Sequence, residues 1–362
     1  MRGRRKRAPE SIGRKRVMEQ TAEKKEPVIL GIESSCDETA AAVIRGRKIL
    51  SDEIASSASV QALYGGVVPE IASRAHADAV DKVVRAAIEN AEITADEIDA
   101  VAVTYGAGLL GALLVGVSFA KAFAYSIGKP LIAVNHIRGH LAAAYLADEN
   151  LQPPFVTLLA SGGHTAILYA ATDTEFSYLG GTKDDAAGEA FDKVARVLGL
   201  PYPGGPNIER LAVQGKAEIP MPQMFKGAGG YDFSYSGLKT AVINYCHGKE
   251  QKGEAYNKAD VAASFQKAAV DVLVKKTIAA AKEKRVRVVT AGGGVIANGY
   301  LRNTLAAACK KNGLRLVLPE KRYCTDNAAM IASEGLIRFR HGEFADLTLN
   351  AKASIPLSVV AD

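Results

Sequence analysis

The chain has 362 residues, of which 48% are hydrophobic, and its formal net charge is +6. Because single domains usually have roughly 100 to 200 residues, we expect two domains with separate buried cores. No stretch of about 18 apolar residues lacks a break or a charge, so we expect no transmembrane span and no membrane partner.

The positive charge gathers in residues 1–27, which contain ten Lys or Arg and four Glu. The rest of the chain therefore holds 35 basic and 35 acidic residues and is neutral. We expect 1–27 to be a disordered basic extension, or a start placed too far upstream of Met18. Two alternatives stay open, namely an Arg-rich transit peptide and a tail that adds salt-sensitive contacts to RNA phosphates.

Apolar runs in the first half predict strands that alternate with helical segments. This alternation is typical of an α/β sheet with helices on its faces. The expected strands lie at 28–32, 40–44, 100–103 and 131–134, and the expected helix lies at 69–91.

The same order of strand, small-residue turn and strand restarts at residue 155. This weak duplication predicts two similar α/β lobes around a cleft. We expect lobes at 28–150 and 151–362, with the final helix, after Thr325, packing back on the first lobe. The second half also carries expected helices at 186–198 and 259–283 and a buried strand at 286–290.

A glycine turn at 106–111 follows the expected strand at 100–103 and matches the dinucleotide fingerprint G-x-G-x-x-G. That fingerprint also needs an acid about 20 residues later to bind the ribose. The corresponding segment, 125–130, contains none. The absence of this acid disfavours a Rossmann-type NAD site, despite the glycine match.

His136 and His140 lie four residues apart where an apolar strand gives way to an alanine-rich helix. Residues at this spacing share one helix face, so both imidazoles could bind a single metal ion. The alternative is a pair of hydrogen-bonded surface histidines. A zinc peptidase of the His-Glu-x-x-His type is excluded, because Ile137 stands where the general base would be.

Two further glycine turns, at 161–165 and 290–294, follow expected strands in the second half. Glycines let the backbone approach a ligand closely, and Ser161 and Thr165 supply hydroxyl donors. Each turn alone is equally compatible with a hairpin or a strand-to-helix connection. Their joint presence in a duplicated α/β fold favours nucleotide binding.

Several charged residues stand near the expected strand and helix ends. Asp37 and Glu38 lie in the first turn, and Asp192 lies past the first turn of its helix, where capping explains it poorly. Asp326 precedes the final helix, where an N-cap is the simpler interpretation. Lys239 could neutralise a phosphate or be a solvated helix residue.

The four cysteines, Cys36, Cys246, Cys309 and Cys324, are scattered and form no C-x-x-C pair. This usage is typical of free thiols in a reducing cytoplasm and gives no zinc finger. We therefore expect a cytoplasmic protein.

Eight ordered motifs span nearly everything after residue 27 and resemble the bacterial TsaD family (also YgjD or Gcp). These are the tRNA adenosine threonylcarbamoyltransferases of the actin/Hsp70/sugar-kinase superfamily. The motifs lie at 31–39, 64–76, 135–140, 161–165, 188–193, 233–240, 292–298 and 324–332.

The resemblance implies an α/β, two-lobed actin-like ATPase (ASKHA) fold, in which a duplicated mixed sheet with flanking helices surrounds a central cleft. It implies transfer of a threonylcarbamoyl group from threonylcarbamoyl-adenylate to the N6 amine of a tRNA adenosine, with release of AMP. That adenosine lies 3′ of the anticodon in tRNAs that read codons beginning with A.

The resemblance also implies the site residues. One divalent ion, of Fe²⁺ type with Zn²⁺ or Mg²⁺ as alternatives, would be held by His136, His140 and Asp326. The substrate would be held by Leu159, Ala160, Ser161, Gly162, Gly163, Asp192, Gly205 and Asn298. The implied partners are tRNA, threonylcarbamoyl-adenylate, a homologous TsaB-like subunit and a TsaE-like ATPase.

The resemblance does not identify the group that takes the proton of the attacking amine. Asp37 or Glu38 could take it, or the adenylate phosphate could accept it instead. The alternative functions are a phosphotransferase or ATPase of the sugar-kinase superfamily, and a non-catalytic scaffold like the homologous partner subunit.

Overall fold

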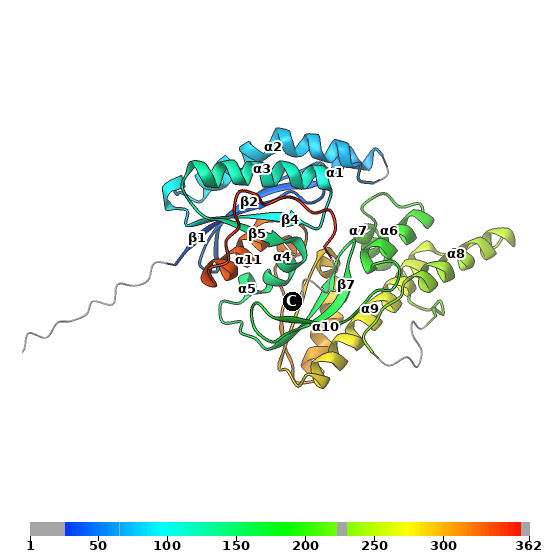
Figure 1. Cartoon of the computed structure of the whole chain (residues 1–362). Coiled ribbons are helices and arrows are strands. Elements are labelled where there is room, and N and C mark those ends of the chain that lie inside the picture. The colour runs from blue at the N-terminus through cyan, green and yellow to red at the C-terminus, as the bar shows by residue number, and fades with distance from the viewer. Residues whose placement is uncertain (1–25, 65, 223–229, 356–362) are drawn as a thin grey trace, which may run out of the picture.

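Two five-stranded mixed sheets organise the chain in a computed structural model that describes residues 26–64, 66–222 and 230–355 (Figure 1). The basic segment 1–27 therefore lies almost wholly outside the described residues. Its last acid, Glu26, is described and forms an ion pair with Arg340 at 2.7 Å.

The first sheet has the strand order β3-β2-β1-β4-β5. β1 pairs with β2 and β2 with β3 in antiparallel fashion, while β4 and β5 continue the sheet in parallel. β1, β2 and β4 are buried along nearly their whole length, which explains why they are continuous apolar runs. The strands are β1 (Val28–Glu33), β2 (Glu38–Arg45), β3 (Lys48–Ser56), β4 (Ala100–Gly106) and β5 (Leu131–Asn135).

The second sheet repeats this arrangement in the order β10-β9-β6-β7-β8. Its first three strands in the chain are again antiparallel, and β9 and β10 again join in parallel. The strands are β6 (Phe155–Ala160), β7 (Thr165–Ala170), β8 (Phe176–Gly181), β9 (Val288–Gly292) and β10 (Arg315–Val317). The predicted duplicated mixed sheet is confirmed. The boundary between lobes at residues 150 and 151 stays a prediction.

Helices cover both faces of each sheet (Figure 1). α2 and α3 pack on one face of the first sheet, and α6 to α10 build the largest core on one face of the second. The helices are α1 (Ala58–Ala62), α2 (Pro69–Asn90), α3 (Leu110–Ser126), α4 (His136–Ala142), α5 (Ala144–Ala147), α6 (Ala187–Val197), α7 (Gly204–Ala212), α8 (Ser236–Gln251), α9 (Lys258–Glu283), α10 (Gly299–Lys311) and α11 (Ala328–Arg340), with short 3-10 turns η1 (Ala95–Glu97), η2 (Gly294–Ala297) and η3 (Lys321–Tyr323).

α4 and α11 lie between the two sheets. Met330 and Ile331 of α11 join a core with β1, β4 and β5, and Ile337 of the same helix joins a core with β6 and β7. Ile137 and Leu141 of α4 belong to that second core. α4, which begins with His136, is therefore packed between the two sheets, and this packing restricts the movement of its side chains.

Most of the expected elements are confirmed, and the differences have local causes. The expected strand at 286–290 begins two residues later, as β9, and the expected helix at 259–283 is α9. The structure adds α3, β3, β8 and β10, among others, which the sequence analysis did not predict. β3 is largely exposed and β10 has three residues, so neither carries a clear apolar run.

Within the described residues, no helix combines the length and apolar character that a membrane crossing requires. All four cysteines are free thiols.

Candidate metal and nucleotide site

Two histidines and one aspartate converge beyond the end of β5. Asn135 caps α4 by accepting a hydrogen bond from the N–H of Ile137 at 2.8 Å, so the helix begins at His136. One turn later His140 lies on the same face, with the two ring centroids 4.6 Å apart. Asp326 comes from the turn before α11, and its Oδ1 lies 3.5 Å from Nε2 of His136 and 3.3 Å from Nε2 of His140.

These three side chains, the triad, fit a divalent metal ion. One ligand atom from each lies within 4.8 Å of the other two. Both ring nitrogens of His140 are buried and neither makes a hydrogen bond, which is costly for a buried polar atom. Coordination through Nε2 would remove that cost for this nitrogen. Two imidazoles with one carboxylate form a donor set that suits Fe²⁺ or Zn²⁺.

The electrostatics of the triad also favour a cation. Burial alone would raise the pKa of Asp326, but the charges of His136 and His140 hold it well below its usual range. Burial likewise would lower the pKa of His136, but Asp326 and Glu33 raise it to about 9. The carboxylates thus stay ionised inside the protein and provide negative charge beside both imidazoles.

Glu33 orients the ring of His136 through its Nδ1 atom. It is the fully buried last residue of β1, and its Oε2 lies 3.2 Å from Nδ1 of His136. Thr104 Oγ1 donates to Oε2 at 2.6 Å and the N–H of Ser35 donates to Oε1 at 2.5 Å, so the carboxylate is held on both sides. A carboxylate on the far nitrogen of a histidine fixes the ring and leaves Nε2 for a metal.

Replacing Glu33 by Gln is expected to weaken metal binding by about 10- to 100-fold, the usual cost of losing a group that orients a metal-binding histidine. The amide keeps the size of the side chain but removes its charge. Zn²⁺ titration against a competing chelator measures the change. Glu53→Gln is the matched control, because Glu53 is a half-buried acid on β3 that accepts a hydrogen bond from Asn90 away from the triad. Wild-type affinity in Glu33→Gln would contradict the orienting role.

Two cavities meet at the triad. The metal-side cavity, of about 400 Å³, is bounded by both histidines, the glycine turn at 161–164, the turn at 107–109 and the segment 353–355. The Asp192 cavity, of about 520 Å³, extends away from it between α6, α7 and the turn after β9. Residues shared by the two walls are Cys36, Ser161, Gly162 and Asp326.

The structure gathers most of the expected substrate residues around these two cavities. Leu159 and Ala160 are the exceptions, because their side chains are fully buried within β6 and line neither cavity. Gly163 lines the metal-side cavity, and Ser161 and Gly162 line both. The Asp192 cavity is lined by Asp37, Glu38, Asp192, Gly205 and Asn298.

Glycines of the site are needed for two different reasons. A Cβ at Gly162, Gly163 or Gly205 would meet no atom within 4 Å, so these positions face open space that a ligand could use. At Gly292 a Cβ would stand 2.2 Å from the carbonyl oxygen of His140. The end of β9 thus packs directly against α4, and Gly292 serves that packing.

Two polar residues of the Asp192 cavity already have structural partners. Asp192 Oδ1 accepts a hydrogen bond from the N–H of Gly204 at 2.7 Å and so tethers the start of α7. Asn298 caps α10 by accepting from the N–H of Leu301 at 2.9 Å and donates to Gln266 Oε1 at 2.8 Å. Burial raises the pKa of Asp192, although the N–H of Gly204 opposes this.

Lys239 lines neither cavity and pairs with Asp185 at 2.9 Å, so its charge is already neutralised within the protein. By contrast, Glu33 and His164 belong to the site and were not predicted. Burial and the charges of the two triad histidines lower the pKa of His164 to about 4, so this ring is neutral at pH 7. The signal for Glu33 was an acid ending an otherwise apolar strand.

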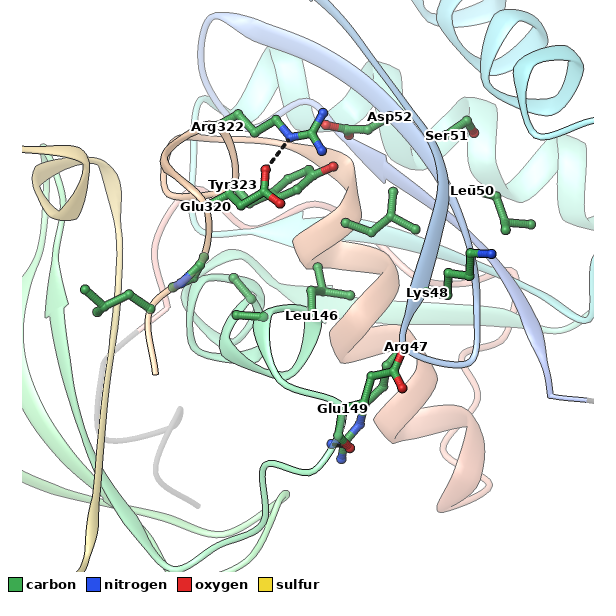
Figure 2. A pocket seen from close by; sticks show the side chains of 15 residues that line it. Arg47, Lys48, Leu50, Ser51, Asp52, Leu146, Glu149, Glu320, Arg322 and Tyr323 are labelled. Carbon is green, nitrogen blue, oxygen red and sulfur yellow. Dashed lines mark hydrogen bonds and ion pairs between the residues drawn. The ribbon is translucent and has the colours of Figure 1, made fainter. Parts of the chain in front are cut away.

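A third cavity, of about 480 Å³, lies among β3, the residues around α5 and the segment at 318–323 (Figure 2). It shares no lining residue with the other two. Its charges are mixed, and Arg322 pairs with Glu320 at 3.1 Å across its upper part, as Figure 2 shows. Without the triad or a glycine turn, this cavity lacks the groups that the expected chemistry needs.

Comparison with known proteins points to one activity. The family model described as "TsaD: tRNA N6-adenosine threonylcarbamoyltransferase" matches residues 48–333. A tRNA N6-adenosine threonylcarbamoyltransferase of Clostridium botulinum (strain Kyoto / Type A2) is 52% identical over 331 residues, 91% of this chain and 97% of that protein. The protein of the same name from Moorella thermoacetica is 52% identical over 332 residues, with the same coverage.

Solved structures with the same overall fold include two HypF proteins. Full-length HypF in a phosphate- and nucleotide-bound form superposes with a TM-score of 0.60 at 16% identity, covering 89% of this chain and 57% of that one. HypF of T. kodakarensis gives 0.61 at 15% identity, covering 90% of this chain and 49% of that one. The chain thus spans about half the length of HypF, and at this identity the likeness concerns the fold alone.

Proposed function

The chain belongs to the TsaD family of tRNA N6-adenosine threonylcarbamoyltransferases, and we propose that its donor is threonylcarbamoyl-adenylate and its acceptor the adenosine 3′ of the anticodon. The N6 amine attacks the carbamate carbon of the donor, and AMP leaves. The proposed tRNAs are those that read codons beginning with A. The observation that carries this assignment is the position of the triad, at the junction of two cavities that can hold donor and acceptor separately.

The donor fits the Asp192 cavity. The carboxylate of Asp192 is placed to accept from ribose hydroxyls, and the open space beside Gly205 gives a sugar or base room to approach. Asn298 lies at the same wall and would contact the adenine. The backbone of Gly162 and Gly163 would support the phosphate, whereas Leu159 and Ala160 could act only through their backbone because their side chains are buried.

The proposed ion is Fe²⁺, with Zn²⁺ or Mg²⁺ as alternatives, and His136, His140 and Asp326 would hold it. When bound, it supplies Lewis acidity to oxygens of the substrate. The protein contributes the rest of the site: Glu33 fixes the ring of His136, and the packing of α4 between the sheets fixes the position of His140. Attack by a weak aryl amine on an activated carbonyl depends mainly on such positioning.

Asp37 and Glu38 divide the proton chemistry between them. Burial, the hydrogen bond that protonated Glu38 donates to Asp37, and the charge of Asp37 raise the pKa of Glu38 to about 9, so Glu38 carries a proton at neutral pH. A protonated carboxyl can donate a hydrogen bond but cannot take up a proton. We therefore assign proton uptake from the amine to Asp37, with the leaving phosphate as the alternative acceptor.

A homologous TsaB-like subunit and a TsaE-like ATPase are the proposed protein partners, and both rest on the sequence resemblance. We also propose a cytoplasmic location, which the tRNA substrate and the free thiols support. The basic segment 1–27 has no assigned role.

The experiment that tests this assignment compares donors. The chain is incubated with tRNA, the proposed partners and either threonylcarbamoyl-adenylate or ATP alone, and digested tRNA is analysed by mass spectrometry. We expect N6-threonylcarbamoyladenosine only with the adenylate. In a parallel assay of the chain alone, without the ATPase partner, we expect no ATP turnover near the roughly 1 to 100 s⁻¹ of kinases. Rapid ATP turnover by the chain alone, without tRNA modification, would instead support a phosphotransferase of the sugar-kinase superfamily.

A further inference from the structure

The end of the described chain forms part of the metal-side cavity. After α11, residues 343–355, the C-terminal strap, run back across the first sheet and pass beside β4 (Figure 1). The N–H of Ala345 donates to the carbonyl of Leu131 at 2.8 Å, and the N–H of Lys352 donates to that of Tyr105 at 2.8 Å. Residues 353–355 of the strap then form part of the cavity wall, which also contains the glycine turn at 161–164.

The glycine turn at 106–108 packs against this strap and donates a hydrogen bond to it. A Cβ at Gly106 would lie 2.4 Å from the carbonyl oxygen of Lys352, and the N–H of Gly108 donates to the carbonyl of Ala353 at 3.1 Å. The motif that matched a dinucleotide fingerprint therefore positions protein backbone, which leaves the strap closely fixed at the mouth of the site.

The walls of the metal-side cavity suit an uncharged aromatic ring. No Lys or Arg stands among the described residues that line it. Ala107 and Leu109 lie beside Ala353 and Ile355 and form one apolar surface with them. His164, which is neutral at pH 7, adds a flat ring. Apart from the proposed ion, the described part of the cavity offers a phosphate no cation, whereas a purine base would find apolar surface and a stacking partner.

The reaction also needs an acceptor on this side. If AMP departs through the Asp192 cavity, the reacting carbonyl lies at the shared wall near Ser161, Gly162 and Asp326. The amine must then approach from the other side of that wall. Enzymes that modify an exocyclic group of a base take the base out of its stack, and an anticodon loop is single-stranded enough to allow this.

We propose that the metal-side cavity receives the flipped-out acceptor adenine of tRNA and that the C-terminal strap, through Ala353 and its neighbours, forms the wall against which this base lies. The proposal rests on the function proposed above, because it assumes an adenosine acceptor. It assigns the strap a direct part in recognising the acceptor.

The test introduces bulky side chains on the C-terminal strap that fill the metal-side cavity. Ala353→Phe is compared with Asn350→Phe, an exposed position three residues earlier on the same strap that lines no cavity, and Ser354→Phe serves as a second filling variant. Full-length chain, loaded with metal and mixed with its partners, is titrated into an anticodon stem-loop carrying fluorescent 2-aminopurine at the acceptor position. This signal needs no donor and no chemistry.

We expect wild type and Asn350→Phe to raise the fluorescence, because the base leaves its stack, and both filling variants to lose that rise. We also expect Ala353→Phe to lower kcat/KM for tRNA at least tenfold, with unchanged affinity for Zn²⁺ and for the adenylate. Weaker adenylate binding would overturn the proposal by placing the threonyl group of the donor in this cavity. An unchanged fluorescence rise and transfer rate would overturn it as well. A wild-type protein that raises the fluorescence but never transfers would refute the proposed function and leave base binding standing.

Discussion

Replacing His140 by Ala is expected to abolish metal binding and threonylcarbamoyl transfer together. The ring is 1% exposed, and its Nε2 lies 3.3 Å from Oδ1 of Asp326, so removing it takes away one of the three proposed ligands. Loss of a group that merely orients a ligand already costs about 10- to 100-fold, so we expect transfer to fall by at least about 100-fold. Metal content of the purified protein and modified nucleoside in digested tRNA are the two measurements.

Asp326→Asn provides a nearly isosteric second variant, because it keeps the shape of the turn before α11 while removing the charge. His247→Ala, at an exposed position of α8, is the matched histidine control. Circular dichroism and thermal unfolding separate a lost ligand from a lost fold. A His140→Ala protein that binds no metal but transfers at the wild-type rate would remove the metal from the proposed reaction.

Glu334→Leu is expected to cost about 3 to 5 kcal/mol of unfolding free energy. Its Oε1 lies 3.1 Å from Nε of Arg138, and the two side chains are buried between α4 and α11. Arg138 also donates to the carbonyls of Asp173 and Thr174, at 3.1 and 2.9 Å, and so ties both helices to the turn between β7 and β8. Removing only the carboxylate takes the charge of Glu334 away from a buried guanidinium, which is the costly way to break such a pair.

Urea unfolding measures this loss. The double variant Arg138→Met with Glu334→Leu should recover part of the stability, because apolar side chains can replace a buried ion pair. Arg74→Ala breaks the exposed pair with Glu70, at 2.8 Å, and should change stability by at most about 1 kcal/mol. Equal losses of unfolding free energy in Glu334→Leu and Arg74→Ala would show that the buried pair stabilises the fold no more than the exposed pair does.

The fold was predictable where burial on both faces of a strand produced an unbroken apolar run. β1 and β6 have this pattern, and each is followed by a small-residue turn and a second buried strand, so the duplication was visible. α3 was harder, since Leu110–Ser126 is apolar on most sides and lacks the period of a helix with one exposed face.

The site was predictable only in part, because its groups come from segments far apart in the chain. The spacing of His136 and His140 indicates a shared face, but nothing local to Asp326 distinguishes a ligand from an N-cap. In the structure the cap of α11 is Asn327, whose Oδ1 accepts from the N–H of Met330 at 2.9 Å. Asp326 is therefore free of the capping role and faces the two histidines. Which of the two residues caps the helix depends on tertiary packing.

We propose that this chain transfers the threonylcarbamoyl group with a metal held by His136, His140 and Asp326. The most direct experiment strips the wild-type protein with a chelator and restores Fe²⁺, Zn²⁺ or Mg²⁺ one at a time, in the presence of tRNA, adenylate and partners. We expect N6-threonylcarbamoyladenosine to disappear on stripping and to return with at least one ion, but not in Asp326→Asn. Full modification of tRNA by verified metal-free protein would contradict it.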